Sequence, residues 1–457
     1  MPDTLLGAGF AGEVIQPGDA GYDQARRLWN AAIDKRPAMV ARPASVADVV
    51  AALRFARERG LEIAVRAGGH SATGHSTSDG GLVLDLGRLD HVIVDPETRI
   101  ARAGGGALLS ALDRAGQVRG LVCPVGVIGH TGVGGLTLGG GMGRLMRRFG
   151  LTIDNLRAVE LVTADGRLVR ASDTDEPDLF WGIRGAGTQF GAVTEFEFEL
   201  QPFDGALTRA IRMYDARHVQ EVWATFRRLA ETAPDEVSMT FGLGRAVPEA
   251  DYPESLAGKP MAFIALNHSG DPASLERDTA AFGEGPPAAQ TIGGPTSYLE
   301  VQTMNDEAMA GGKRSYIDSA FASDLGRDVL DRLINHLADA PGEAWFSASA
   351  FGGAMARVDD EATAFPSRGL AFDTSADAGA WEDPADDDRY IGWTRRAMEI
   401  TAPSVASFGR YTNEISDSDD AVSRSVYGAV KYARLAALKR AWDPDNVFHG
   451  THNIATA

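Results

Sequence analysis

Residues 63–81, IAVRAGGHSATGHSTSDGG, decide how we interpret the fold of this chain. A short apolar run ends at Arg66 and gives way to paired glycines, a histidine and several hydroxyl residues, before the chain turns apolar again at Leu82. This pattern predicts a β-strand that leads into a ligand-binding loop. Gly68 and Gly69 adopt positive φ at low cost, and successive N–H groups in such a turn form a concavity that suits phosphate.

The polar side chains of this loop strengthen the prediction of a pyrophosphate site. Further hydrogen-bond donors are supplied by Arg66, Ser71, Thr73 and Ser76, and we expect His70 at the edge of the site. A tight turn with a solvated histidine is the alternative, because short motifs recur by accident.

The run RAGGHS at residues 66–71 resembles the flavin-attachment loop of the berberine bridge enzyme-like oxidases. These proteins belong to the p-cresol methylhydroxylase (PCMH) and vanillyl-alcohol oxidase class of FAD proteins. In that family the histidine of the loop is bonded to the 8α-methyl group of the flavin. The resemblance therefore implies a covalent bond between FAD and His70.

A second segment, residues 126–155, has the sequence GVIGHTGVGGLTLGGGMGRLMRRFGLTIDN. Its ten glycines are unfavourable inside a core helix or strand, because each one raises the entropy lost on ordering. We expect a surface that a ligand or another backbone approaches closely. The strings GLTLGGG and RRFGLTIDN resemble the second flavin-contacting segment of the same oxidases.

Two more stretches resemble the family. Residues 178–194, DLFWGIRGAGTQFGAVT, match its segment beside the adenine, with Ala192 where valine is usual. The tail, with WDPDNVF at residues 442–448 and HNI at residues 452–454, matches a segment that in the family packs back onto the flavin domain.

Carried over residue by residue, the resemblance implies FAD contacts in all of these segments. The implied cofactor-binding residues are Arg66, Ala67, Gly68, Gly69, His70, Ser71, Gly74, His75, Thr131, Gly132, Gly135, Leu136, Gly139, Gly140, Gly141, Asn155, Gly191, Val193 and Asn453.

Members of the family often carry a second flavin bond from a cysteine, eleven residues before the first glycine of the GGG string. In this chain that position is Ile128, and the single cysteine, Cys123, lies five residues earlier. We therefore expect FAD to be attached through His70 only. Cys123 is expected to be a small buried apolar residue.

The resemblance places two residues on the substrate side of the flavin. Tyr411 matches a position whose phenol faces the flavin, and Asn413 shares its face if this segment is a strand. A free phenol titrates near pH ~10, so Tyr411 needs a neighbouring cation or donor to act as a base. Arg410 is adjacent but is expected to point to the opposite face. Tyr411 as a residue that only orients substrate is the alternative.

The predicted fold class is α+β, with a PCMH-type FAD-binding fold of two α/β subdomains and a second, substrate-binding domain. The first domain is expected over residues 1–203, with its PCMH-type part at about 36–203. Helical and strand patterns alternate over residues 204–408, which predicts an antiparallel sheet backed by helices. Residues 409–457, with a helix over 421–441, are expected to return to the FAD domain. In the first domain we expect a β-α-β unit over residues 38–66, with Ser45 capping its helix, and the alternation over residues 193–200 predicts a half-buried strand.

Composition limits the classes of function. Lysine plus arginine number 44 and aspartate plus glutamate 63, so the net charge is −19, which disfavours binding to nucleic acid or anionic membranes. One cysteine excludes an internal disulfide. No signal sequence or apolar stretch of membrane-spanning length is present, so we expect a cytoplasmic protein, monomeric or homodimeric.

The resemblance implies an FAD-dependent oxidase that takes hydride from a small organic substrate at flavin N5 and passes the electrons to O2, giving H2O2. One alternative is a flavin-N5-oxide-type oxygenase, because Thr131 and Leu136 match positions that shape an oxygen pocket in some bacterial members. Another is a non-catalytic nucleotide-binding module. The histidine pairs at 70/75 and 449/452 lack the usual carboxylate or cysteine partners, so we expect no metal site.

Overall fold

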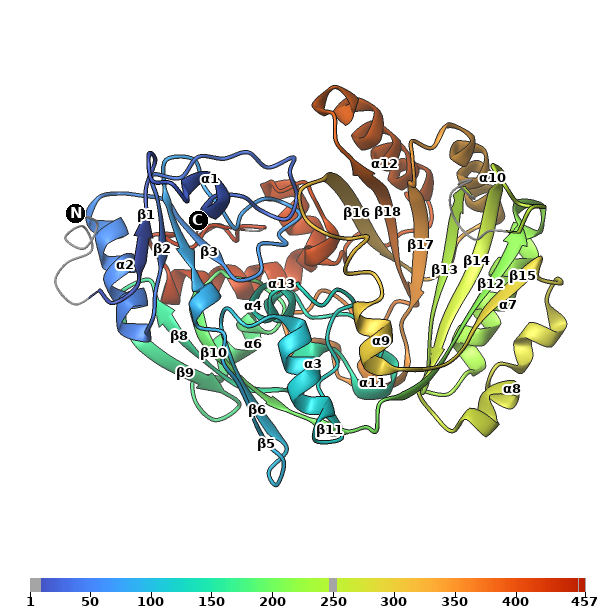
Figure 1. The fold of residues 1–457 in the computed structure, drawn as a ribbon, viewed down its shortest axis with the longest axis horizontal. Helices are drawn as coiled ribbons and strands as arrows, with labels where there is room; N and C mark the ends of the chain where they lie inside the picture. The colour runs from blue at the N-terminus through green and yellow to red at the C-terminus, as the bar shows by residue number, and fades with distance from the viewer. Residues whose placement is uncertain (1–9, 246–252, 451, 457) are drawn as a thin grey trace.

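The computed structural model describes residues 10–245, 253–450 and 452–456. Three large sheets organise the described residues, and the short strands β7 Leu121–Val122 and β11 Gln201–Pro202 form a fourth, two-stranded sheet. Figure 1 shows the four- and five-stranded sheets in one half of the molecule and the seven-stranded sheet in the other. The C-terminal segment runs back to the half that holds the N-terminal sheets. The mixture of sheets and helices confirms the predicted α+β class.

The first sheet is built around the strand that opens the glycine loop. Its order is β1-β2-β4-β3, with β2, β4 and β3 parallel and β1 antiparallel to β2. The predicted β-α-β unit is present, but β4 lies between its two strands. The bounds are β1 Glu13–Ile15, β2 Met39–Arg42, β3 Ile63–Arg66 and β4 Leu82–Asp85.

The connection from β2 to β3 is the helix α2, Val46–Glu58. The Ser45 side chain accepts a hydrogen bond from the Asp48 N–H and so caps the first turn, as its position in the sequence predicts. Val49 and Leu53 bury the apolar face of α2 against the sheet. This packing orients β3, so that its carboxyl end delivers the glycine loop to the middle of the molecule.

The second sheet is antiparallel in the order β5-β6-β10-β8-β9. Phe196 and Phe198 alternate with acidic residues along β10 and lie in the core, which explains the alternating pattern of that segment. The bounds are β5 Val92–Asp95, β6 Ile100–Gly104, β8 Leu156–Thr163, β9 Leu168–Ser172 and β10 Gly191–Glu199. The helices α3 Leu109–Gln117, α4 Val133–Leu138 and α6 Pro177–Ile183 belong to the same half.

The third sheet has seven antiparallel strands in the order β15-β12-β14-β13-β17-β18-β16. The helices α7 Val219–Thr232, α10 Arg327–His336 and α12 Asp387–Thr401 cover one face (Figure 1). This confirms the predicted antiparallel sheet with a helical backing. The bounds are β12 Ala206–Asp215, β13 Val237–Arg245, β14 Pro260–His268, β15 Gln290–Ser297, β16 Arg314–Ala322, β17 Trp345–Ala350 and β18 Phe372–Trp381.

The return of the chain is made by α13, Asp420–Trp442. This helix is predicted by the sequence over residues 421–441, and it is kinked at Gly428, which has φ 66° and ψ 174°. The second part of α13 ends in a buried ion pair, where Lys439 Nζ lies 2.8 Å from Asp443 Oδ2. Lys439 Nζ also donates to the carbonyl oxygens of Gln189 and Phe448, and so ties the tail to the first half of the chain.

Replacing Lys439 with methionine is expected to lower the free energy of unfolding by about 3–5 kcal/mol, because the buried Asp443 carboxylate then loses its counter-charge. Urea unfolding followed by circular dichroism measures the change. Arg440→Met removes the same charge from the exposed side of the helix and is expected to change stability by less than about 0.5 kcal/mol. Equal effects of the two substitutions contradict this account.

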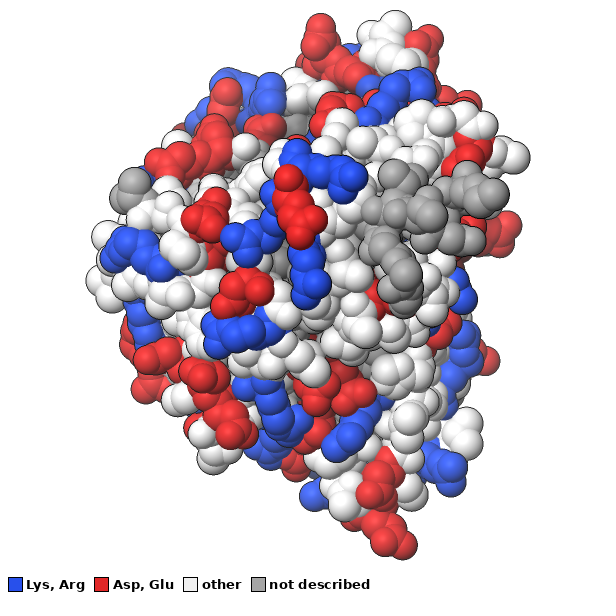
Figure 2. Space-filling model, turned by 90° about the vertical axis from the view of Figure 1, so that its left-hand side faces the viewer, with Lys and Arg blue, Asp and Glu red and all other residues white. Residues whose placement is uncertain are grey.

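The surface charge is mixed despite the net charge of −19. Figure 2 shows acidic and basic side chains interspersed over one face, with no continuous basic area on it. Within the described residues, no helix combines the length and the apolar character needed to cross a bilayer.

Candidate active site

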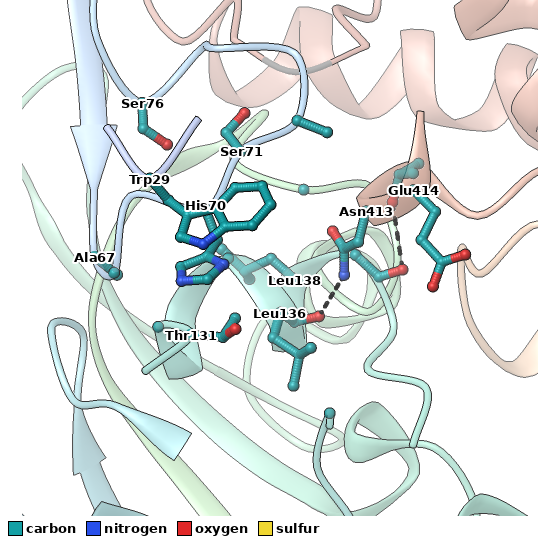
Figure 3. Close-up of a pocket in the computed structure, with 18 of the residues that line it drawn as sticks. Trp29, Ala67, His70, Ser71, Ser76, Thr131, Leu136, Leu138, Asn413 and Glu414 are labelled. Atoms are coloured by element: carbon teal, nitrogen blue, oxygen red, sulfur yellow. Dashed lines mark hydrogen bonds between the residues drawn. The ribbon is translucent and has the colours of Figure 1, made fainter. Parts of the chain in front are cut away.

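A large cavity lies between the glycine loops of the first half and the open face of the seven-stranded sheet (Figure 3). It brings together residues that are up to 423 positions apart in the sequence, from Trp29 to His452. The predicted site residues that line it are Ala67, Gly68, Gly69, His70, Ser71, His75, Thr131, Gly132, Gly135, Leu136, Gly139, Val193, Tyr411 and Asn413.

The two glycine segments touch each other at the floor of this cavity. A Cβ atom on Gly68 would lie 2.3 Å from the Gly132 nitrogen, and one on Gly132 would lie 2.3 Å from the Gly68 nitrogen. Only glycine permits this approach of two backbones. Gly69 has φ +73°, which turns the loop after the contact.

The turn leaves backbone donors available for a ligand. Within the described residues, the N–H groups of Gly69, His70 and Ser71 donate to no protein acceptor. Gly135 faces open space in the same cavity, where a Cβ would meet nothing within 4 Å. Free N–H groups in a glycine-lined concavity fit the pyrophosphate of a dinucleotide.

His70 is held in one orientation by two rings. It stacks on Trp29 with ring centroids 5.1 Å apart and an interplanar angle of 18°, and its Nε2 lies 2.8 Å from Nδ1 of His130. His130 Nε2 lies 3.2 Å from the carbonyl oxygen of Asp306, which only accepts, so this nitrogen carries the proton of a neutral His130. His130 Nδ1 then accepts from His70, and His70 Nδ1 keeps its lone pair. Burial, with a smaller effect of His130, lowers the pKa of His70 to about 3, so the ring is neutral.

Arg66 lies behind the glycine loop and not on the cavity wall. Its guanidinium donates to Asp85 Oδ2 at 2.8 Å and to the Ala25 carbonyl oxygen at 2.6 Å, and it is buried behind the loop. The ion pair leaves no free donor on the cavity side. Arg66 thus orients the strand before the loop and does not line the cavity.

Other predicted contact residues also lie outside the cavity. Asn155 donates to the carbonyl oxygens of Phe149 and Leu151. Asn453 lines a second, shallower pocket together with His75. The remaining glycines serve packing or pairing: Gly74 against Ile33, Gly140 against Phe365, Gly141 against Thr152, and Gly191 in β10 opposite Thr163.

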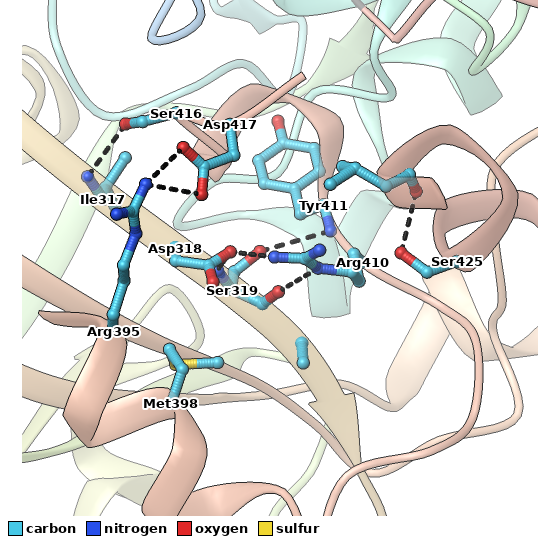
Figure 4. Close-up of polar contacts among 12 residues, drawn as sticks. Ile317, Asp318, Ser319, Arg395, Met398, Arg410, Tyr411, Ser416, Asp417 and Ser425 are labelled. Carbon is cyan, nitrogen blue, oxygen red and sulfur yellow. Dashed lines mark hydrogen bonds and ion pairs between the residues drawn. The ribbon is translucent and has the colours of Figure 1, made fainter. Parts of the chain in front are cut away.

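Tyr411 and Asn413 lie on the opposite wall, although their segment is a 3-10 turn, Thr412–Glu414, and not the strand assumed from the sequence. Tyr411 Oη accepts hydrogen bonds from the Met142 N–H and from Asn413 Nδ2, both at 3.0 Å. Burial raises the pKa of Tyr411 well above its usual value. As predicted, Arg410 points away, to Asp318 and the Ser319 carbonyl oxygen (Figure 4). The structure therefore favours an orienting phenol over a base.

Replacing Tyr411 with phenylalanine is expected to lower the free energy of unfolding by about 1–3 kcal/mol, because the buried Met142 N–H then loses its acceptor. Thermal and urea unfolding of the flavin-loaded protein measure the change. Tyr390→Phe is a suitable control, since Tyr390 stacks on Trp381 outside the cavity. A Tyr411→Phe protein as stable as the control contradicts the expected role.

Two carboxyl groups that the sequence did not single out also line the cavity. They belong to Asp377 on β18 and Glu414 in the 3-10 turn. Burial raises the pKa of Asp377 to about 6 and also raises that of Glu414, where Asp377 adds repulsion. The sequence held one signal that could have identified Asp377. Side chains alternate between the two faces of a strand, so positions 373, 375 and 377 of β18 lie on the same face.

Cys123 is buried in the core of the first half and does not line the cavity. Ile128, the position at which the family resemblance implies the second flavin bond, does line it. The expectation that Cys123 is a small buried residue is confirmed.

Comparison with known proteins gives the family of the chain. The family model described as FAD binding domain matches residues 37–172, and the model described as berberine and berberine like matches residues 411–455. The chain is 32% identical to (R)-6-hydroxynicotine oxidase of Paenarthrobacter nicotinovorans, over 97% of this chain and 96% of that protein. The chain belongs to the berberine bridge enzyme-like FAD-linked oxidoreductases.

Solved structures agree with this assignment. The crystal structure of 6-hydroxy-D-nicotine oxidase from Arthrobacter nicotinovorans matches with a TM-score of 0.88 and 28% identity, covering 99% of both chains. The structure of BBE-like 1 from Physcomitrella patens matches with a TM-score of 0.90 and 24% identity, covering 100% of this chain and 99% of that one, and shows the same fold. The predicted PCMH-type fold is confirmed, and this berberine bridge enzyme-like protein is an FAD-linked oxidoreductase.

Proposed function

We propose that this protein is an FAD-dependent oxidase, which takes hydride from a small organic substrate and uses O2 as electron acceptor, with H2O2 as product. The main support is that one cavity has the His70 loop on one side and a wall with ionisable side chains on the other. FAD supplies the two-electron chemistry at its N5 atom when it is bound. The relatives named above as oxidases support the proposal.

The cofactor side of the cavity is assigned to the glycine segments. The free N–H groups of residues 69–71 would hold the pyrophosphate, and Thr131, Gly132 and Gly135 would line the rest of the site. His70 would carry the only covalent bond to the flavin. In domain terms, residues 1–203 and 409–457 would form the FAD-binding part and residues 204–408 the substrate-binding part.

The substrate side is assigned to the open face of the seven-stranded sheet. Tyr411 and Asn413 would orient the substrate, because the phenol is fixed by two hydrogen bonds that it accepts. Asp377 and Glu414 would accept the proton that the substrate loses, because their pKa values lie much closer to neutrality than that of Tyr411.

The oxidase activity is tested without knowing the substrate. The purified yellow protein is reduced with dithionite under argon and then mixed with air-saturated buffer, while absorbance at the flavin bands and H2O2 are followed. Full reoxidation within seconds, with about one H2O2 per flavin, is the expected result. Slow reoxidation contradicts an oxidase, and a resting spectrum unlike ordinary oxidised flavin favours the oxygenase alternative.

A further inference from the structure

The charges on the cavity wall are of one sign. Asp377 and Glu414 line the cavity, whereas no lysine or arginine does so within the described residues. The histidines at the cavity are neutral at pH 7, because burial lowers the pKa of His70 to about 3 and those of His75 and His452 to about 4. The cavity therefore carries negative charge without a counter-charge of its own.

Two arginines that belong to or contact the segment 410–417 have acidic partners. Arg410 is paired with Asp318, and Arg395 lies 3.1 Å from Asp417 (Figure 4). Neither side chain lines the cavity. Within the described residues, no cationic side chain lines the cavity beside these two carboxyl groups, so a cationic ligand would be their counter-ion.

A third carboxyl group, that of Asp373, lies behind the first two. Its side chain is 3% exposed, shares the cavity-facing side of β18 with Asp377, and meets the Glu414 carboxyl. Asp373 Oδ1 has no hydrogen-bond partner in the described part of the chain. Burial and repulsion by Glu414 raise the pKa of Asp373 far above its usual value, so this carboxyl holds the proton, and its hydrogen bond to Glu414 partly offsets the rise in the pKa of Glu414.

An aromatic ring completes the wall. Trp345 on β17 is directly opposite Asp377 on β18, and both line the cavity. The indole is 45% exposed, which is unusual for such a large apolar side chain. An aromatic face beside carboxylates is the arrangement that attracts organic cations.

We propose that the substrate is an organic cation, a protonated amine, whose charge lies between Asp377 and Glu414 with its carbon skeleton against Trp345. This inference rests on the proposed oxidase function and names the substrate class for the same cavity. Burying two carboxylates is costly unless a positive charge accompanies them, and a protonated amine also supplies N–H donors to both. A neutral alcohol would supply one donor and no charge.

Binding of matched probes to the flavin-loaded protein tests the proposal. Benzylamine and cyclohexylamine are compared with benzyl alcohol and cyclohexanol at pH 7.5, and the Kd of each is read from the perturbation of the flavin absorbance. Each amine is expected to bind at least tenfold more tightly than its alcohol. Benzyltrimethylammonium, a permanent cation, is expected to compete with benzylamine.

The substitutions Asp377→Asn and Glu414→Gln are each expected to weaken amine binding roughly tenfold or more, and to leave alcohol binding within about twofold, since only the charged partner loses an ion pair. Glu382→Gln is the matched control, because it removes the same charge from an exposed position just after β18. Circular dichroism establishes that each variant is folded. Because Asp377→Asn and Glu414→Gln lie at different positions, the same loss of amine affinity in both variants supports the proposal independently.

Alcohols that bind as tightly as the amines, amines that do not bind, or amine affinities unchanged in both cavity variants would overturn the proposal. Dithionite-reduced protein that is reoxidised rapidly by air in the same preparation shows that the oxidase function holds regardless of this result. A protein without flavin, or one that reoxidises slowly, shows instead that the proposed function is wrong.

Discussion

Replacing His70 with alanine is expected to release the flavin from the polypeptide. In the native protein we expect the yellow colour to stay with the chain after precipitation in trichloroacetic acid, because the cofactor is covalently bound. His70 is suited to this bond, since hydrogen bonding to His130 leaves Nδ1 as the unprotonated nitrogen and stacking on Trp29 fixes the plane of the ring. The fraction of flavin in the pellet is the measurement, and it should fall from nearly all to none.

Two variants serve as controls for this result. His75→Ala removes another imidazole from the same cavity and is expected to keep the flavin attached. Cys123→Ser is expected to do the same, because the thiol lies in the core away from the cavity. Colour that washes out of the unmodified protein, or that stays in the pellet with His70→Ala, contradicts attachment through His70 alone.

Replacing Gly132 with alanine is expected to have the second largest effect, a loss of stability of roughly 1–3 kcal/mol or more together with loss of flavin. The backbone of Gly132, with φ −74° and ψ 134°, is open to any residue, so the cost is steric. The new Cβ would lie 2.3 Å from the Gly68 nitrogen and 2.7 Å from the Ala67 Cβ. The steric clash can be relieved only if the two glycine loops separate, and this separation would deform the cavity that they form.

Gly135→Ala is the matched control, three residues along the same segment. Its Cβ meets nothing within 4 Å, and alanine favours the helix α4 by up to about 1 kcal/mol. Urea unfolding followed by circular dichroism should therefore separate the two variants. The methyl group of Gly135→Ala enters the cavity, where it can also affect flavin binding. Flavin content is therefore measured in both variants alongside stability. Equal stability of Gly132→Ala and Gly135→Ala contradicts the backbone contact.

Local patterns were enough to predict the architecture of this chain. The apolar run at residues 63–65, the serine cap at residue 45 and the alternation in residues 193–200 each appear as the expected element. Their signals are local, because hydrophobic periodicity and capping depend on neighbours within a few residues. The helix predicted at residues 421–441 is present as α13, but it is kinked at Gly428, where the ring of Phe408 occupies the space beside the glycine.

The sequence predicted the parts of the site that are formed by backbone conformation. It did not predict which hydrogen-bond or ion-pair partner a polar side chain would have. The glycine loops meet as expected, since glycine is required wherever two backbones touch. Arg66 was assigned to phosphate because of its position in the motif, but it binds Asp85, whose carboxylate is brought beside it by the parallel pairing of β3 with β4.

The sequence by itself determined the α+β class, the family resemblance, the glycine loops and the histidine between them, because these depend on short-range conformational preferences and on motifs of fixed spacing. Only the tertiary structure decided that Tyr411 is held by Met142 and Asn413, and that Asp373, Asp377 and Glu414 meet at one wall. The pKa and the availability of a side chain depend on burial and on partners far away in the chain, and both exist only after the sheets have packed together.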